Sequence, residues 1–160
     1  MATTAINPIA RQDPVVRQIT PEDAEAVAEL SGQLGYETSA REMKDRIEKM
    51  LPLEDGHLAL VACLENEVVG WVEAEILRHL QSPAHTLITG LVVRDGARSF
   101  GIGKRLCSEV ERWSLGRGVP VVRVTSRMTR ERAHRFYLRE GFVQTKTSAV
   151  FEKILSSNAE

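Results

Sequence analysis

The stretch Leu87–Glu111, LITGLVVRDGARSFGIGKRLCSEVE, decides the fold of this chain. It opens with an apolar run to Val93 that is typical of a buried strand. The run breaks at Arg94-Asp95-Gly96, a sequence that favours a turn. From there on the apolar residues take helical spacing, at Ile102, Leu106, Val110 and Trp113. The stretch therefore predicts a strand, a glycine-containing turn and the start of a helix.

A turn of this kind can bind an anion. The first N–H groups of a helix have no partner inside it, and the helix dipole adds partial positive charge at the same end. Gly101 and Gly103 let a ligand come close to the main chain. We therefore expect the turn to hold a phosphate group.

Three phosphate-binding patterns can be compared with the turn. Gly96 and Gly101 have the spacing of a P-loop, but the Lys and Ser/Thr that should follow are missing. Gly101 and Gly103 begin the Rossmann pattern GxGxxG, but Leu106 stands where the third glycine belongs. The third pattern, Arg/Gln-x-x-Gly-x-Gly/Ala, is met by Arg98, Gly101 and Gly103.

A second motif follows in Ala133–Phe142, AHRFYLREGF, which matches Ala-x-x-Phe-Tyr-x-x-x-Gly-Phe. With both motifs in this order, the chain resembles the GCN5-related N-acetyltransferase (GNAT) superfamily, as a small bacterial-type single-domain member. The resemblance covers about Val15 to Ile154 and is strongest from Leu87 to Phe142. One departure is Arg127 after Ser126, where the family more often has Asn.

The resemblance implies a GNAT fold of the α/β class (an α+β arrangement with a mixed sheet). Its central sheet would be mostly antiparallel, with about six to seven strands, and about four helices would flank it. Strands 4 and 5 would be parallel and splayed. The sequence pattern places helices from Pro21, from Ser39, which forms a capping box with Glu42, from Ile102 and over Arg130–Glu140. The predicted strands are Val15–Ile19, His57–Leu64, Val68–Leu77, Leu87–Val93, Val119–Val124, Val143–Thr147 and Ala149–Ile154. We expect a flexible tail over residues 1–13, one N-acetyltransferase domain over 14–155 and a tail over 156–160.

In the resembled family the turn binds the pyrophosphate of acetyl-CoA, and the preceding strand binds the pantetheine arm by its main chain. The resemblance also makes Tyr137 the general acid that protonates the leaving thiolate. It thus implies direct transfer of an acetyl group from acetyl-CoA to an amine in a ternary complex, with no metal. The implied cofactor-binding residues are Leu91, Val92, Val93, Arg98, Ser99, Phe100, Gly101, Ile102, Gly103, Lys104 and Ser126.

Glu73 and Glu75 lie on one face of a predicted strand with Trp71, because side chains alternate along a strand. Two interpretations stay open. Both carboxylates can lie on a solvated part of the sheet, or one can be the general base that takes the proton of the amine, directly or through water. His79 and His85 flank the loop that follows, and we interpret them as surface residues.

The acceptor is the least determined part of the function. Several acidic residues could face a cationic amine, which favours a small-molecule primary amine: Glu37, Glu42, Asp45, Glu73 and Glu75. A protein or peptide N-acetyltransferase, or a non-catalytic acyl-CoA-binding sensor on the same fold, are the alternatives. The partners we expect are acetyl-CoA and the amine, and family members often form homodimers.

Composition limits the kinds of partner and the cellular location that we expect for this protein. The net charge of −1 argues against a general nucleic-acid or membrane-surface binder. Cys63 and Cys107 lie in apolar surroundings without metal spacing, which indicates core thiols in a reducing cytoplasm. No run approaches the roughly 18 apolar residues that span a bilayer, and the N-terminus has no signal pattern. We therefore expect a cytoplasmic protein that binds neither nucleic acid nor membrane.

Overall fold

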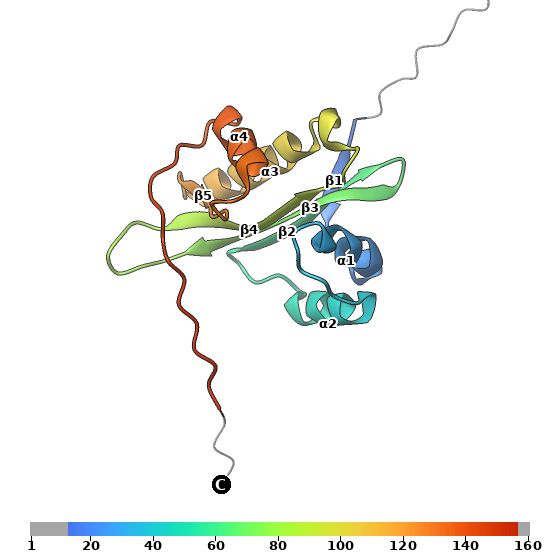
Figure 1. Cartoon of the computed structure of the whole chain (residues 1–160), viewed down its shortest axis with the longest axis horizontal. Helices are drawn as coiled ribbons and strands as arrows, with labels where there is room; N and C mark the ends of the chain where they lie inside the picture. The colour runs from blue at the N-terminus through green and yellow to red at the C-terminus, as the bar shows by residue number, and fades with distance from the viewer. Residues whose placement is uncertain (1–12, 157–160) are drawn as a thin grey trace, which may run out of the picture. The chain divides into compact units, whose positions relative to one another are not determined.

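The computed structural model describes residues 13–156 (Figure 1). They fall into two compact units that join between Thr125 and Ser126. The first unit holds a sheet and three α-helices, and the second holds one α-helix. The predicted tails lie almost wholly outside the described residues, and the single domain over 14–155 stays a prediction.

The first unit is built on a mixed sheet whose strands lie side by side in chain order. β1 to β4 pair as antiparallel neighbours, and β5 pairs with β4 in parallel. This confirms the predicted α/β class, with a mostly antiparallel sheet and a parallel fourth and fifth strand. The strands are β1 Val15–Gln18, β2 His57–Leu64, β3 Glu67–Leu77, β4 His85–Val93 and β5 Val122–Val124.

The first two helical segments begin where the sequence predicts, at Pro21 and after Ser39. α1 (Ala24–Gly32) follows a 3₁₀ turn at Pro21–Asp23. α2 (Ala40–Met50) begins with a capping box, in which the Glu42 N–H donates to Ser39 Oγ and the Ser39 N–H donates to the Glu42 carboxylate, each at 3.1 Å. The remaining α-helices are α3 (Ile102–Gly116) in the first unit and α4 (Glu131–Arg139) in the second.

Two β-bulges interrupt the regular pairing of the sheet. Between β2 and β3 the register shifts at Ala62/Cys63, which leaves Val69 as the extra residue. Between β3 and β4 it shifts at Glu73/Ala74, which leaves Thr89 as the extra residue. A bulge changes the register by one, so it decides which side chains share a face beyond it.

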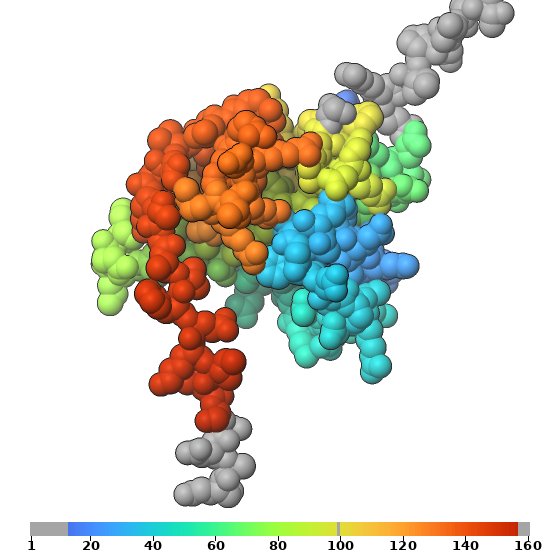
Figure 2. Space-filling model, viewed as in Figure 1, coloured from blue at the N-terminus to red at the C-terminus, as the bar shows by residue number. Residues whose placement is uncertain are grey.

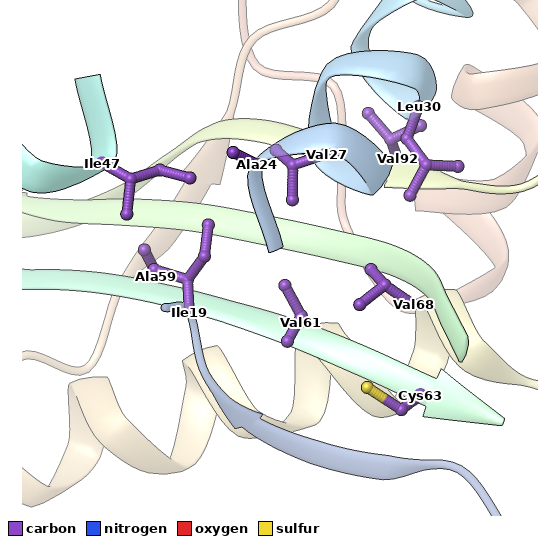
Figure 3. Packing of buried hydrophobic residues seen from close by; sticks show 10 residues of the cluster. All are labelled: Ile19, Ala24, Val27, Leu30, Ile47, Ala59, Val61, Cys63, Val68 and Val92. Atoms are coloured by element: carbon purple, nitrogen blue, oxygen red, sulfur yellow. The ribbon is translucent and has the colours of Figure 1, made fainter. Parts of the chain in front are cut away.

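α1 and α2 cover one face of the sheet and close the main apolar core (Figures 1 and 3). The labelled side chains point toward one another from both helices and from β2, β3 and β4 (Figure 3). Figure 2 shows the blue and cyan atoms of α1 and α2 packed against each other. The cluster consists of Ile19, Ala24, Val27, Leu30, Ile47, Ala59, Val61, Cys63, Val68 and Val92. Cys63 is thus a core thiol, as predicted.

α3 packs on the opposite face of the sheet (Figure 1). Its apolar residues Ile102, Leu106 and Val110 are fully buried. The first turn of the helix fits against Gly70 of β3, because a Cβ on Gly70 would lie 2.9 Å from the Val92 carbonyl oxygen and 3.1 Å from Ile102 Cγ2. This glycine lets the helix start lie directly on the sheet.

We expect Gly70→Ala to lower the free energy of unfolding by about 1–3 kcal/mol, because the new methyl group must displace a main-chain carbonyl. Chemical denaturation measures the change. Gly116→Ala is the matched control, since a Cβ there meets nothing within 4 Å, and it should leave stability unchanged or slightly raised. Equal stabilities for the two variants would contradict this packing.

Asp23 joins the start of the first helical segment to β1. Its carboxylate receives two hydrogen bonds of 2.8 Å from the Arg17 guanidinium and one of 2.8 Å from the Thr20 N–H. Burial raises the pKa of Asp23, but the bonds from Arg17 and Thr20 outweigh it and hold the pKa below its usual value. The ionised form therefore stabilises the fold.

We expect Asp23→Asn to lower the free energy of unfolding at pH 7 by about 1–2 kcal/mol, the lower part of the range for charged hydrogen bonds because Arg17 is partly solvated. Since the folded pKa lies below the unfolded value near 3.9, the contribution is present above about pH 4 and is lost as the pH falls through the folded pKa. Denaturation at a series of pH values measures it. A stability difference that persists unchanged at pH 2 would contradict this role.

The sequence prediction fails at the C-terminal end. Val143–Thr147 and Ala149–Ile154 were expected to be strands, but residues 142–156 form no strand (Figure 1). The described sheet accordingly has five strands rather than six or seven. Apolar side chains in this segment, such as Val150 and Phe151, are exposed. Alternating apolar residues make a strand only when a neighbouring strand supplies the ladder of hydrogen bonds, and here none pairs with them.

Candidate active site

The turn between β4 and α3 has the form of an anion-binding cup. After β4 the chain makes a turn at Gly96 and a 3₁₀ segment over Arg98–Phe100. Gly101 then takes a left-handed conformation, with φ 71°, and caps α3. The first N–H groups of α3, from Ile102 onward, have no acceptor within the helix and lie at its positive end. This arrangement can hold a phosphate by main chain alone.

Two of the charged side chains near the cup already form ion pairs within the protein. Arg98 forms an ion pair of 2.8 Å with Asp95, and Arg105 forms one of 3.3 Å with Glu109. Lys104 is exposed on the first turn of α3, and Phe100 is half-exposed beside the cup. A ligand phosphate would therefore compete with Asp95 for Arg98, whereas Lys104 can approach it directly.

The two parallel strands part before the cup. β4 and β5 pair only from Thr86 to Ile88 on the β4 side. Beyond this point Leu91, Val92 and Val93 pair with β3 and not with β5. The predicted splay is therefore present, and within residues 13–125 no strand pairs with the β5-facing edge of β4 at Leu91–Val93, so an extended ligand could add main-chain hydrogen bonds there.

The two predicted carboxylates lie on the face of the sheet that α1 and α2 cover, beyond the apolar cluster. Glu73 and Glu75 are 31% and 34% exposed, so both reach solvent while their stems pack on the sheet. The Trp71 ring lies over Gly90, whose Cβ would meet the ring at 2.5 Å. A side chain at Gly90 would thus clash with the Trp71 ring. Gly90 also directly follows the bulge residue Thr89.

A second acidic feature lies between α1 and α2. A groove of about 500 Å³ is lined by Ala28, Glu29, Gly32, Glu37, Thr38, Ser39 and Glu42. It brings together Glu37 and Glu42, which the sequence singled out, and adds Glu29. Asp45 is not part of it and pairs with Lys49 at 2.7 Å. The pKa of Glu42 lies below its usual value because the Ser39 N–H donates to its carboxylate, which keeps it anionic.

Tyr137 lies on α4 in the second unit, in a small aromatic cluster. Its ring meets those of Phe136 and Phe142 edge to face, with centroids 5.3 and 5.6 Å away. The Phe142 N–H donates to the Tyr137 carbonyl at 2.9 Å, which fixes the end of the helix. The motif residues therefore serve to hold the ring of Tyr137 in one place.

Ser126 directly follows the first unit in sequence. Its hydroxyl is buried and makes no hydrogen bond within residues 13–156. A buried polar group without a partner is costly unless a ligand or water supplies one. The hydroxyl therefore fits the predicted role of contacting a bound molecule.

Sequence reasoning missed His57, whose Nε2 lies 3.5 Å from Glu73 Oε1 and 4.0 Å from Glu75 Oε2. What brings His57 to the carboxylates is the pairing register of β2 and β3, and no motif in the sequence predicts that register. His85 was also misjudged as a surface residue. It begins β4, is 5% exposed, and stacks on His79 with ring centroids 5.4 Å apart.

Two other features of the described chain bear on function. Over residues 13–156, no cluster of three or more His, Cys, Asp or Glu side chains is arranged to hold a metal ion. Over the same residues, no helix is both long and apolar enough to cross a membrane.

Comparison with known proteins gives a family match over most of this chain. The model of the acetyltransferase (GNAT) family matches residues 24–142. An aminoglycoside N(6')-acetyltransferase type 1 from Stenotrophomonas maltophilia is 28% identical over 151 residues, which cover 91% of this chain and 97% of that protein. The matched region includes the cup, both carboxylates and the Tyr137 motif.

Solved structures agree in fold at low sequence identity. The aminoglycoside 6'-N-acetyltransferase AAC(6')-Ig from Acinetobacter haemolyticus superposes with a TM-score of 0.76 at 17% identity, covering 89% of this chain and 99% of that one. AAC(6')-Iy, in complex with the bisubstrate analogue CoA-S-monomethyl-acetylneamine, gives 0.76 at 19% identity, covering 90% and 100%. At this identity the likeness shows the shared fold.

Proposed function

Because the chain belongs to the acetyltransferase (GNAT) family, we propose that it moves an acetyl group from acetyl-CoA to a primary amine of a small cationic molecule, of the aminoglycoside type. The observation that carries the choice of acceptor is the distribution of acid on the α1–α2 side of the sheet. The groove with Glu29, Glu37 and Glu42, together with Glu73 and Glu75, suits a molecule with several ammonium groups.

In this proposal the cup holds the pyrophosphate of acetyl-CoA. The main-chain N–H groups of Ser99–Lys104 would donate to it, with Arg98 and Lys104 adding charge. The open edge of β4 at Leu91–Val93 would bind the pantetheine arm as an added strand, and one N–H there would polarise the thioester carbonyl. The Ser126 hydroxyl would gain the partner that it lacks.

The chemistry then needs proton transfers both at the amine nitrogen and at the sulfur. Glu73 or Glu75, directly or through one water, takes a proton from the ammonium group, because only the neutral amine attacks. The amine nitrogen forms a bond to the acetyl carbon while the carbon–sulfur bond breaks. The electron pair of that bond leaves with sulfur, and Tyr137 donates its phenolic proton to the thiolate. The acylated nitrogen loses its second proton to solvent and becomes the neutral amide, solvent returns a proton to the phenolate, and the carboxylate passes its proton to solvent. Because the amine attacks the thioester directly, no acyl-enzyme is formed and neither cysteine is needed.

The proposal is tested by acetyl-CoA consumption with a panel of amines: an aminoglycoside, a polyamine, an amino acid and a lysine-containing peptide. We expect the aminoglycoside or the polyamine to give the highest kcat/KM. Preference for the peptide would favour a protein N-acetyltransferase. Tight acetyl-CoA binding without turnover on any amine would favour an acyl-CoA sensor, and either result would overturn the proposed acceptor.

A further inference from the structure

His57 is placed against both candidate base residues. Its Nε2 is 3.5 Å from one oxygen of Glu73 and 4.0 Å from one oxygen of Glu75. All three side chains are about one-third exposed. The imidazole nitrogen therefore lies near both carboxylates, which would otherwise repel each other.

The bulge in β3 creates this arrangement. In the tight hairpin end, Leu64 pairs with Glu67 and Cys63 with Val68. If this register continued, His57 would pair with Ala74, and Glu73 and Glu75 would lie on the opposite face, which α3 covers. The extra residue Val69 shifts the register by one, so His57 pairs with Glu75 and Ala59 with Glu73. Histidine and carboxylates thereby share a face.

The residues that β4 and the core cluster bring to this face of the sheet are uncharged. β4 opposes the carboxylates with Leu87 and Gly90, and the Thr89 hydroxyl donates to the Glu73 carbonyl at 3.3 Å. The residues of α1 and α2 in the core cluster are apolar, and Asp55, in the turn before β2, pairs with Arg117 at 3.3 Å. Within residues 13–125, the basic side chain that lies within 4.0 Å of Glu73 and Glu75 is that of His57.

We propose that His57 is a positioning residue for the general base: it lies near both carboxylates and fixes their orientation, so that the base carboxylate is held in one place toward the acceptor amine. The inference rests on the proposed function, because it takes Glu73 or Glu75 as the base. The proton of the ammonium group still moves to the carboxylate, and His57 forms and breaks no bond. Its effect is on geometry, which acts on the rate of the chemical step.

The test replaces His57 in two ways and follows acetylation of the best amine. His57→Leu removes the ring nitrogen and should lower kcat about 10- to 100-fold, with KM for acetyl-CoA within about twofold of the parent. His57→Gln places an amide donor near the position of Nε2 and should stay within about threefold of the parent. One of the two variants Glu73→Gln and Glu75→Gln removes the base carboxylate. When His57→Leu is added to that variant, kcat should change less than about twofold relative to the single variant.

The controls separate this role from a structural one. His79→Gln, on the loop that follows β3, should leave kcat within about twofold. A His57→Leu effect that persists in both carboxylate backgrounds, or a His57→Gln variant as slow as His57→Leu, would overturn the positioning role.

The contact can also be examined without substrate. The ¹⁵N signals of the His57 ring should move on Glu73→Gln, while those of the other three histidines stay in place. Unmoved His57 signals would overturn the proposal. Failure of every amine in the panel would overturn the proposed function and this role with it, whereas a His57→Leu rate within twofold of the parent would overturn the role alone.

Discussion

Replacing Tyr137 with phenylalanine is expected to lower kcat about 10²- to 10⁴-fold, while acetyl-CoA binds as tightly as before. The substitution removes one oxygen and keeps the ring. The edge-to-face contacts with Phe136 and Phe142 need only the ring, so the fold of the second unit should survive. What is lost is the proton for the departing thiolate, since a phenol with an ordinary pKa near 10 holds its proton at neutral pH yet can give it to sulfur.

Steady-state kinetics with the preferred amine, together with acetyl-CoA titration of each variant, measure this prediction. Tyr36→Phe is the matched control, because Tyr36 is the other tyrosine of the chain and lies 59% exposed in the segment after α1. Its kcat should stay within about twofold of the parent. A Tyr137→Phe enzyme that turned over at the parental rate would remove Tyr137 from the mechanism.

Gly101→Val is expected to weaken acetyl-CoA binding about 10- to 100-fold, measured as Kd by calorimetry. Gly101 caps α3 with φ 71°, a left-handed conformation that a β-branched residue adopts only with strain. Apart from the two neighbouring residues of the chain, nothing lies within 4 Å of a Cβ at this position, so the valine side chain would occupy open space at the start of α3, where we expect the diphosphate. The loss corresponds to one or two charge-assisted hydrogen bonds to phosphate.

Gly118→Val controls for the cost of backbone strain. Gly118 follows the other end of α3 with φ 73°, and a Cβ there also meets nothing within 4 Å. Both variants should lose similar stability, but only Gly101→Val should lose affinity for acetyl-CoA. Equal affinities in the two variants would contradict the assignment of the cup as the pyrophosphate site.

The elements of the first unit could be predicted because local sequence and tertiary packing agree there. The break at Arg94-Asp95-Gly96 and the apolar spacing from Ile102 predicted β4, the turn and α3, and each is present. The capping box at Ser39 predicted the start of α2 in the same way. These signals act within a few residues of the chain, so they can be recognised without knowing the fold.

The two main errors have a different cause, because both depend on contacts between distant segments. His57 shares a face with the carboxylates only because the bulge at Val69 shifts the strand register by one. No sequence pattern near Val69 predicts an extra residue in the ladder. The segment from Val143 has the alternation of a strand, but alternation cannot supply the neighbouring strand that pairing requires. The place of Glu29 in the acidic groove could not be predicted from the sequence either, because it depends on how α1 and α2 pack together.

The central claim is that the main-chain cup between β4 and α3 binds coenzyme A, and a crystal structure of the protein with coenzyme A tests it most directly. We predict that the diphosphate accepts hydrogen bonds from main-chain N–H groups within Ser99–Lys104, and that the pantetheine arm follows Leu91–Val93. A diphosphate bound anywhere else on the chain would contradict it.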